Sequence, residues 1–221
     1  MTITRESVQA LLSSEEYSDR IRGLNHLRQL DQTTGFELIQ PLITDSQARV
    51  RYAAVSQLDH LGTVDPAAAL VLLRDRLQHD SEADVQAAAA DAIAALKLTD
   101  GFDDLKQAYE TTTEWLLQFS IVAALGEMGD PRGFDLLVDA LKSDQSLLYT
   151  AAISAFGELG DRRAVPLLLP FQSDDDWQVR YRIAQSLNRL GGDEAKTALA
   201  HLAQDSVEVV ANEAQRGIAA D

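Results

Sequence analysis

Apolar and polar residues follow each other with a helical period, and one such pattern occurs twice in nearly the same form. The segment DSQARVRYAAVSQLDHLG, from Asp45 to Gly62, is echoed by DDDWQVRYRIAQSLNRLG, from Asp174 to Gly191. Apolar residues recur in both at steps of three and four, which is the spacing of one face of an α-helix. The occurrence of the same helical pattern at two distant points of the chain indicates an internal repeat.

The repeat is defined by an apolar anchor residue twelve positions before a closing glycine. Four segments fit this rule, with the anchors Val50, Leu117, Leu148 and Val179 before Gly62, Gly129, Gly160 and Gly191. Val85 and Val209 fill two further slots, and a weaker copy, DRIRGLNHLRQLD, begins at Asp19. The spacings from Val50 onward are 35, 32, 31, 31 and 30 residues, so we expect about seven units.

Each unit predicts two helices. The second helix is expected to end at the closing glycine, which permits a left-handed turn. Its expected start is an acidic or hydroxyl N-cap four or five positions before the anchor, namely Asp45, Asp80, Thr112, Asp144 or Asp175. Asp65-Pro66 and Asp130-Pro131 then predict starts of first helices, with Asp as the cap and Pro at the first helical position.

A pair of helices cannot bury its apolar stripe alone, so neighbouring units must stack. The hydrophobic share of 46% with only 6% aromatic residues, drawn mainly from Ala and Leu, also favours helices. The sequence therefore predicts an all-α fold, a right-handed α-solenoid of about seven helical repeats, as a single domain over residues 1–221. On a helical wheel the core face is Val50, Ala54, Leu58 and Leu61.

The opposite face of the second helices carries the candidate ligand site. Tyr52 and its counterparts in the other units are Ile21, Ala87, Phe119, Thr150, Tyr181 and Ala211, and the next row includes Asp91. Three aromatic rings in a row of seven could stack on a flat conjugated ligand. The alternative is that the rings only cover neighbouring repeats. Tyr149, beside this row, completes the candidate set.

Two arginines and two tryptophans occupy equivalent positions of the repeat. Arg51 and Arg180 follow the anchor, and Arg20 aligns with them. They could bind ligand carboxylates, or they could form a ladder in which each Arg pairs with a capping Asp of the next repeat. Trp115 and Trp177 lie two positions before the anchor, where they could face a ligand or pack between adjacent caps.

Composition and charge exclude several classes of partner and of chemistry. The formal charge of −16 disfavours nucleic acid and anionic membranes as partners. The chain has neither a long apolar span nor a secretory leader, so the cytoplasm is the expected location. With no cysteine, any thioether must belong to a partner. No metal site is expected from the scattered His26, His60, His79 and His201, and Glu127 and Glu158 fit the repeat consensus better than acid/base catalysis.

The repeats resemble a known family. Leu159 to Gly192, LGDRRAVPLLLPFQSDDDWQVRYRIAQSLNRLGG, is similar to the HEAT-like repeats of the phycobilisome lyases, the E/F-type bilin lyases, and LGEMGDPRGF and FGELGDRRAV repeat the turn of that family. In length and in its opening segment the chain looks like the small cyanobacterial members that take part in phycobilisome degradation.

The resemblance implies partners and a ligand. It implies binding to phycobiliprotein subunits, phycocyanobilin as a non-covalent ligand, help with its detachment during phycobilisome degradation, and a place at the periphery of phycobilisomes. Catalytic residues and turnover are left open by the sequence. The alternative function is a non-catalytic HEAT-repeat scaffold for protein–protein interaction, for example in iron–sulfur protein maturation.

Overall fold

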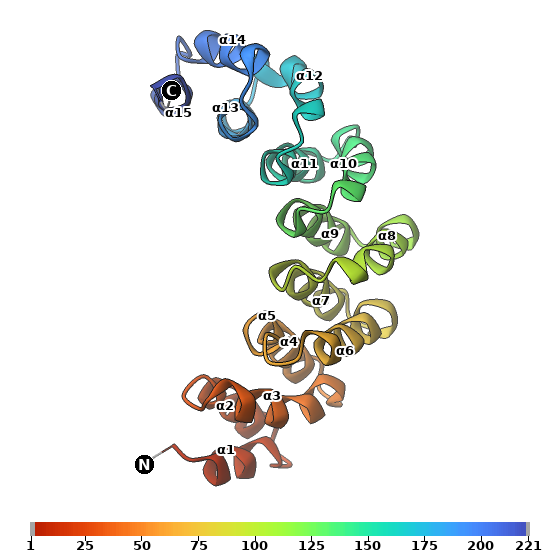
Figure 1. Cartoon of the computed structure of the whole chain (residues 1–221). Helices are drawn as coiled ribbons and strands as arrows, with labels where there is room; N and C mark the ends of the chain where they lie inside the picture. Colours follow the sequence, from red (N-terminus) through yellow and green to blue (C-terminus); the bar gives the residue numbers. More distant parts are fainter. Residues whose placement is uncertain (1–2, 220–221) are drawn as a thin grey trace. The chain divides into compact units, whose positions relative to one another are not determined.

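The computed structural model describes residues 3–219, which are helical or irregular and contain no β-strand. The elements, shown in Figure 1, are α1 (Arg5–Leu12), α2 (Tyr17–Leu27), α3 (Gln32–Ile39), η1 (Gln40–Thr44), α4 (Ala48–Ser56), α5 (Leu58–Leu61), α6 (Pro66–His79), α7 (Ala83–Ala95), η2 (Thr99–Gly101), α8 (Phe102–Thr111), α9 (Trp115–Met128), η3 (Pro131–Gly133), α10 (Phe134–Leu141), α11 (Ser146–Leu159), η4 (Arg162–Ala164), α12 (Val165–Leu168), η5 (Leu169–Ser173), α13 (Trp177–Leu190), α14 (Asp193–Leu202) and α15 (Glu208–Ala219). The η segments are 3₁₀ turns.

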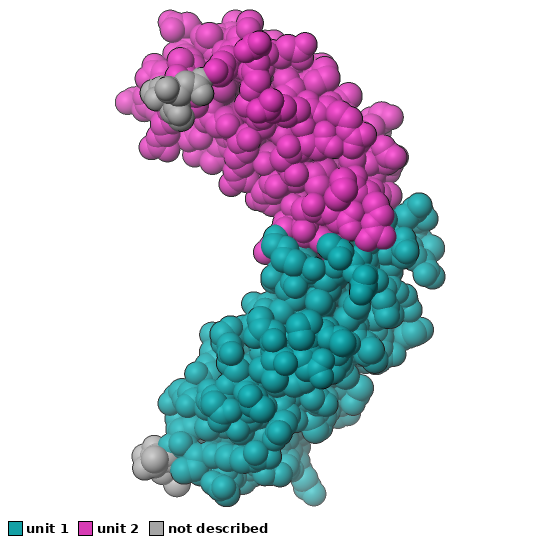
Figure 2. Space-filling model, in the orientation of Figure 1, with its two compact units in different colours: residues 1–121 teal, residues 122–221 magenta. Residues whose placement is uncertain are grey.

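The described helices form seven pairs, one for each predicted repeat. The second helices are α2, α4 with α5, α7, α9, α11, α13 and α15. Residues 1–121 and 122–221 form two compact units, coloured separately in Figure 2. In the first unit α4 packs on α2 and α7, and in the second α13 packs on α11 and α15, as Figure 1 also shows. The predicted all-α solenoid of about seven repeats is confirmed, whereas the single domain stays a prediction.

The predicted core face is confirmed in α4 and α5. Val50, Ala54 and Leu58 are fully buried and Leu61 is nearly so. Tyr52, on the opposite side of α4, is 48% exposed, as the wheel required.

The structure shifts one anchor. The backbone N–H of Val210 bonds to Val207 O at 3.0 Å, as that of Val50 bonds to Gln47 O at 2.9 Å, and Val210 is buried whereas Val209 is 49% exposed. The prediction of Val209 as the anchor of the last repeat, and of Ala211 as the counterpart of Tyr52 in that repeat, was therefore wrong by one residue. We number positions from the anchor, so that position 9 lies nine residues after it. The anchors, at position 0, are Val50, Val85, Leu117, Leu148, Val179 and Val210, and in the first repeat the polar Asp19 takes this position because Arg20 aligns with Arg51.

The predicted caps of the second helices were also misplaced. The helices begin two or three residues later, and the residue at position −5 instead accepts a hydrogen bond from the backbone N–H two residues on. Asp45 Oδ1 accepts from Gln47 N at 2.8 Å, and Thr112 Oγ1 accepts from Glu114 N at 3.1 Å. Such a turn suits Asp, Asn, Ser and Thr as well as a cap does, which is why the residue type misled. The residues with this role are Ser14, Asp45, Asp80, Thr112, Ser143, Asp174 and Asp205, so Asp144 and Asp175 are not among them.

The first helices and the closing glycines agree better with the sequence. Asp65 caps α6 by accepting from Ala68 N at 3.0 Å, while Asp130 caps the 3₁₀ turn η3. Gly129, Gly160 and Gly191 have φ of 75°, 73° and 64°, as predicted. The prediction was wrong for Gly62, which has a right-handed φ of −65°. It is a glycine for lack of space, because a Cβ there would lie 2.6 Å from Leu58 O.

Two glycines at position 9 bring neighbouring second helices into backbone contact. A Cβ on Gly126 would lie 2.6 Å from Ala155 Cα, and one on Gly157 would lie 2.8 Å from Ser186 Cα. Ala155 and Ser186 are both at position 7 of the following repeat. Position 9 of one repeat therefore packs directly on position 7 of the next, and close packing requires small residues at both.

Candidate functional site

The predicted arginines form an inter-repeat ladder, defined here by the pairs Arg20–Asp45, Arg51–Asp80 and Arg180–Asp205. Arg51 Nε and Nη2 each donate to the Asp80 carboxylate at 2.7 Å, and Nη1 donates to Asp45 O at 3.0 Å. The Asp80 side chain is fully buried and that of Arg51 is 11% exposed. Of the two interpretations of Arg51, the ladder is therefore the one that the structure contains.

Arg180 repeats these contacts in the second unit. Its Nε and Nη2 donate to Asp205 at 2.6 and 3.0 Å, and its Nη1 donates to Asp174 O at 2.7 Å. The guanidinium hydrogen bonds lower the pKa of Asp205 below its ordinary value of 3.8. Burial opposes the ionisation of Asp80, but hydrogen bonds from Arg51 and the Glu82 backbone outweigh it, and the pKa of Asp80 is also lowered. Ionised Asp and bidentate Arg at both places indicate a structural role.

The ladder is interrupted in the third, fourth and fifth repeats, where position 1 holds Gln86, Gln118 and Tyr149, and at the first of these both partners change together. At position 1 the third repeat has Gln86, and position −5 of the next repeat has Thr112. Gln86 Nε2 donates to Leu77 O at 3.1 Å instead of to a carboxylate. Gln86, Thr112 and Leu77 line a cavity of about 250 Å³ at this point. The neutral pair therefore avoids an unpaired buried charge and leaves a space.

The aromatic residues of the predicted site lie at the surface and are divided between the two units. Tyr52, Phe119 and Trp115 belong to residues 1–121, whereas Tyr181 and Trp177 belong to residues 122–221. Trp115 and Trp177 are 52% and 42% exposed and start α9 and α13, as the equivalence predicted. Phe119 and Tyr181 are half-buried.

The remaining predicted site residues take separate places. Tyr149 is at position 1 of its repeat, where others carry the ladder arginine, and it stacks on Phe171 with ring centroids 5.9 Å apart. Desolvation and the charges of Asp174 and Asp176 raise its pKa. Asp91 is exposed on α7. Of the two catalytic candidates considered, Glu158 pairs with Arg189 at 3.2 Å and Glu127 is exposed.

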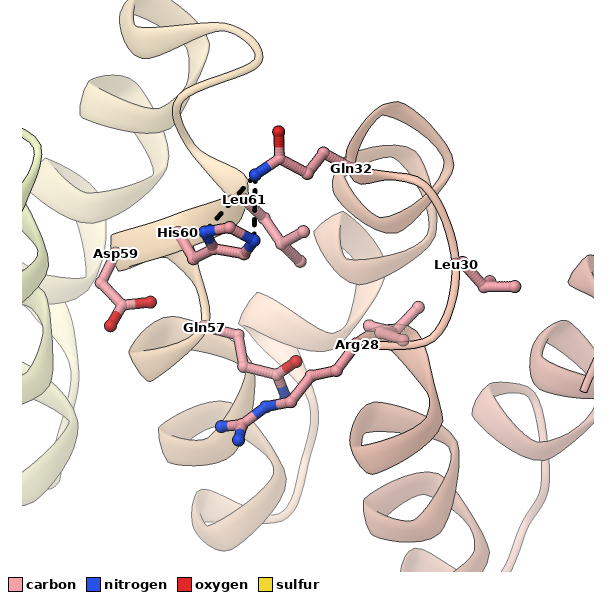
Figure 3. Close-up of a pocket in the computed structure, with 8 residues that line it drawn as sticks. Arg28, Leu30, Gln32, Gln57, Asp59, His60 and Leu61 are labelled. Carbon is pink, nitrogen blue, oxygen red and sulfur yellow. Dashed lines mark hydrogen bonds between the residues drawn. The ribbon is translucent and has the colours of Figure 1, made fainter.

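A cavity that the sequence did not predict lies between the first two repeats (Figure 3). It has a volume of about 370 Å³ and is lined by Leu27, Arg28, Leu30, Gln32, Gln57, Asp59, His60 and Leu61. Figure 3 shows the Arg28 side chain beside that of Gln57, with the His60 ring next to Gln32 across the cavity. Gln32 Nε2 lies 2.9 Å from His60 Nε2. The volume is within the range of about 300 to 1,000 Å³ that is common for small-molecule sites.

The cavity exists because large residues occupy the close-packing positions. Arg28 is at position 9 and Gln57 at position 7, where the fifth and sixth repeats place Gly157 against Ser186. Asp59 occupies position 9 of the second repeat. Two long polar side chains in place of a glycine–serine contact hold the helix ends apart.

Gln57 also breaks the second helix of its repeat into α4 and α5. Its side-chain Nε2 donates to Ala53 O at 3.2 Å, while its backbone N–H bonds to Ala54 O at 3.2 Å. In a continuous α-helix the Gln57 N–H would bond to Ala53 O. A side chain that occupies a carbonyl needed for a backbone hydrogen bond of the helix is a recognised cause of such breaks. The break places Asp59 and His60 at the cavity.

The charged groups of the cavity are not neutralised within the described part of the chain. Neither Arg28 nor Asp59 has an ion-pair partner among residues 3–219, although acidic residues outnumber basic ones by 35 to 19 in the sequence. Both side chains are exposed. The site therefore presents one free guanidinium, one free carboxylate and an imidazole.

Aligning the repeats by position would have revealed this site. Position 7 holds Ala or Ser in the third to sixth repeats, so Gln57 stands out as a large amide among small residues. Position 9 holds Arg28 and Asp59 in the first two repeats and Ala94, Gly126 and Gly157 in the next three. We considered the rows at positions 2 and 6, which face away from the core, and not these.

Comparison with known proteins identifies the repeat. HEAT repeats match residues 5–94, 70–155 and 147–219, which together span nearly the whole chain. The chain belongs to the HEAT-repeat family. A search of proteins with curated functions found no match.

Solved structures share this HEAT-repeat fold over most of their length. The complex of CpcE and CpcF of phycocyanin lyase from Nostoc sp. PCC7120 matches with a TM-score of 0.65 and 18% identity, over 99% of this chain and 94% of that one. The E. coli protein YibA matches with a TM-score of 0.69 and 16% identity, over 98% and 81%. A HEAT-like repeat protein from Thermococcus onnurineus NA1 matches with a TM-score of 0.59 and 11% identity, over 99% and 97%. At these identities the HEAT-repeat fold is what is shared.

Two further findings concern metal ions and membranes. Within residues 3–219, no three His, Asp or Glu side chains gather in a way that could hold a metal ion. None of the described helices is both long enough and apolar enough to cross a bilayer.

Proposed function

We propose that this HEAT-repeat protein handles bilin chromophores, binding phycocyanobilin non-covalently and assisting its detachment from phycobiliprotein subunits. One observation carries the proposal: the fold matches a phycocyanin lyase structure over 99% of this chain and 94% of that chain. A match of both full lengths supports a common architecture better than a match to part of a longer solenoid. The repeat segment from Leu159 to Gly192 adds support through its similarity to the bilin lyases.

The proposal takes the chain to be a relative of NblB, the small cyanobacterial phycobilisome degradation protein that it resembles in length and opening segment. The protein would then work in the cytoplasm at the periphery of phycobilisomes. Because the chain has no cysteine, the thioether to the chromophore is carried by the phycobiliprotein and this protein supplies a cradle. Exposed rings such as Tyr52 and Trp177 offer stacking surface for a conjugated ligand.

Absorption spectroscopy tests the proposal directly. The purified protein is added to phycocyanobilin at increasing concentration, with bovine serum albumin as the comparison protein. We expect a red-shifted and sharpened visible band that saturates with protein, because a rigid site holds the chromophore in one extended conformation. A spectrum no different from that with albumin would refute bilin handling.

A second function, a scaffold for protein–protein interaction, is supported by the exposed apolar residues at the starts of the second helices. In the second unit Leu147, Trp177 and Val209 are 56%, 42% and 49% exposed at position −2 or −1 of three successive repeats. Exposed carboxylates accompany them, including Asp144, Asp176 and Glu208. Apolar anchors with charged surroundings are typical of protein interfaces. Such a scaffold could serve phycobiliproteins or, as for other members of this repeat class, iron–sulfur protein maturation.

The two functions predict different losses. A Leu147→Ala/Trp177→Ala variant should lose capture of phycobiliprotein subunits from a cyanobacterial lysate and keep the bilin spectrum if the row is a protein interface. Loss of the bilin spectrum with capture intact would mean that the row binds chromophore instead.

A further inference from the structure

We propose that the cavity between the first two repeats (Figure 3) is a carboxylate-binding site, in which Arg28 receives a propionate of the bilin. The choice of bilin as the ligand rests on the proposed function. The location of the site rests on the cavity, its charges and the residues that keep it open.

Arg28 is available for a ligand in a way that the predicted arginines are not. Arg51 and Arg180 each hold a buried or nearly buried carboxylate in bidentate geometry. A ligand carboxylate could bind to either of them only by displacing Asp80 or Asp205, and breaking a buried pair is strongly unfavourable. Arg28 is exposed and has no carboxylate within ion-pair distance among the described residues, so its fork is open to a carboxylate ligand.

Among the arginines without an ion pair, the surroundings of Arg28 are also favourable. Arg49 lines a cavity of about 340 Å³ together with Glu82 and Asp84, whose charges repel a carboxylate. In the Arg28 cavity the only carboxylate is Asp59, which Figure 3 shows on the far side of the His60 ring. A tetrapyrrole presents N–H groups as well as propionates, so Asp59 complements the donors while Arg28 complements the acid.

The walls suit a flat apolar body with polar edges. Leu30 and Leu61 line the cavity beside the polar groups, and the Gln57 amide lies next to Arg28. A cavity of about 370 Å³ has room for part of a tetrapyrrole, so the rest of the chromophore would extend outside it. A site that takes one end of a ligand fits a protein that must release a chromophore rather than keep it.

The experiment uses the full chain and two forms of the chromophore, phycocyanobilin and its dimethyl ester, which lacks both acidic groups. Dissociation constants are measured from the visible spectrum for the parent, Arg28→Gln, Arg28→Lys and the matched control Arg49→Gln. Circular dichroism checks that each variant is folded, which we expect because both arginines are exposed.

We expect the parent to prefer the free acid over the ester by about tenfold, as a charge-assisted pair would give. Arg28→Gln should abolish this preference by weakening the free acid alone, Arg28→Lys should keep part of it, and Arg49→Gln should not change it. Binding of the free acid that Arg28→Gln leaves unchanged would overturn this inference and leave the proposed function standing. No spectral change with the parent would overturn both.

Discussion

The ladder pair Arg51–Asp80 offers a test of how charges stabilise the stacked repeats. The chain itself supplies the substitution, because Gln86 and Thr112 fill the same two positions one repeat later. Asp80→Thr keeps a side-chain oxygen for the turn at position −5, as Thr112 does with Glu114 N at 3.1 Å. It removes the acceptor of both Arg51 hydrogen bonds at 2.7 Å and of an Arg76 hydrogen bond at 3.1 Å, although Arg76 keeps its pair with Asp75. Arg51 is then left nearly buried without a counter-charge.

The expected loss follows from that geometry. Breaking one partner of a buried ion pair typically costs about 3 to 5 kcal/mol. We take the lower end, about 3 kcal/mol, because Arg51 is 11% exposed and keeps its bond to Asp45 O at 3.0 Å. The double variant Arg51→Gln/Asp80→Thr should recover more than half of the loss, because it removes the stranded charge and reproduces a pair that the fold already accepts.

Urea denaturation followed by circular dichroism gives the free energies of unfolding, with hydrogen exchange in α4 and α7 to locate the change. The control is Glu158→Ala, which breaks the exposed pair with Arg189, 42% and 55% exposed, and should cost no more than about 1 kcal/mol. If the double variant loses as much as the sum of its two single variants, the ladder is not a coupled pair. The reasoning would then be refuted.

Three further predictions concern pH, packing and the core. The lowered pKa values of Asp80 and Asp205 mean that their ionised forms stabilise the folded state above about pH 4. The melting temperature should therefore drop as the pH falls below about 4 through the lowered folded-state pKa values, and it should drop less in Arg51→Gln/Asp80→Thr. A pH-independent melting temperature would contradict this. Gly157→Ala should lower the free energy of unfolding by about 1 to 3 kcal/mol, because the new Cβ would meet the backbone of Ser186. Asp59→Ala, at the same position of the second repeat, should be nearly neutral in urea denaturation. Ala54→Glu should lower the melting temperature far more than Asp130→Ala. The first change buries a charge at a fully buried position, whereas the second removes a cap and an ion pair with the half-exposed Arg132.

The architecture could be predicted from the sequence because the same pattern of residues occurs in seven units. The anchor Val50 and its counterparts, the apolar spacing and the Asp65-Pro66 start all follow from local rules, and each unit supports the reading of the others. Errors arose where two structures use the same residue type. Asp45 could cap a helix or close a turn, and Gly62 could permit a left-handed conformation or a close approach.

The candidate site was harder to predict because it depends on what faces a residue in the next repeat. The two readings of Arg51 could be separated only by the position of Asp80, which lies 29 residues away in sequence. The cavity at Arg28 depends on the contact between position 9 of one repeat and position 7 of the next. On a wheel of the isolated helix, position 9 faces away from the core and position 7 lies at the edge of the core face, so the wheel alone does not show that the two positions meet across neighbouring repeats.

The interruption of the ladder at Gln86 and Thr112 also has a consequence for how the first unit opens. In a linear array of repeats, unfolding spreads through interfaces between neighbours, and it pauses where the coupling across an interface is weak. Arg20 and Arg51 tie the first three repeats to one another by charge, whereas residues of α7 and α8 line a cavity of about 250 Å³ that has only uncharged residues in its walls. The amides of α2, α4 and α7 should therefore exchange with solvent as one cooperative block, with α8 opening separately and at lower free energy.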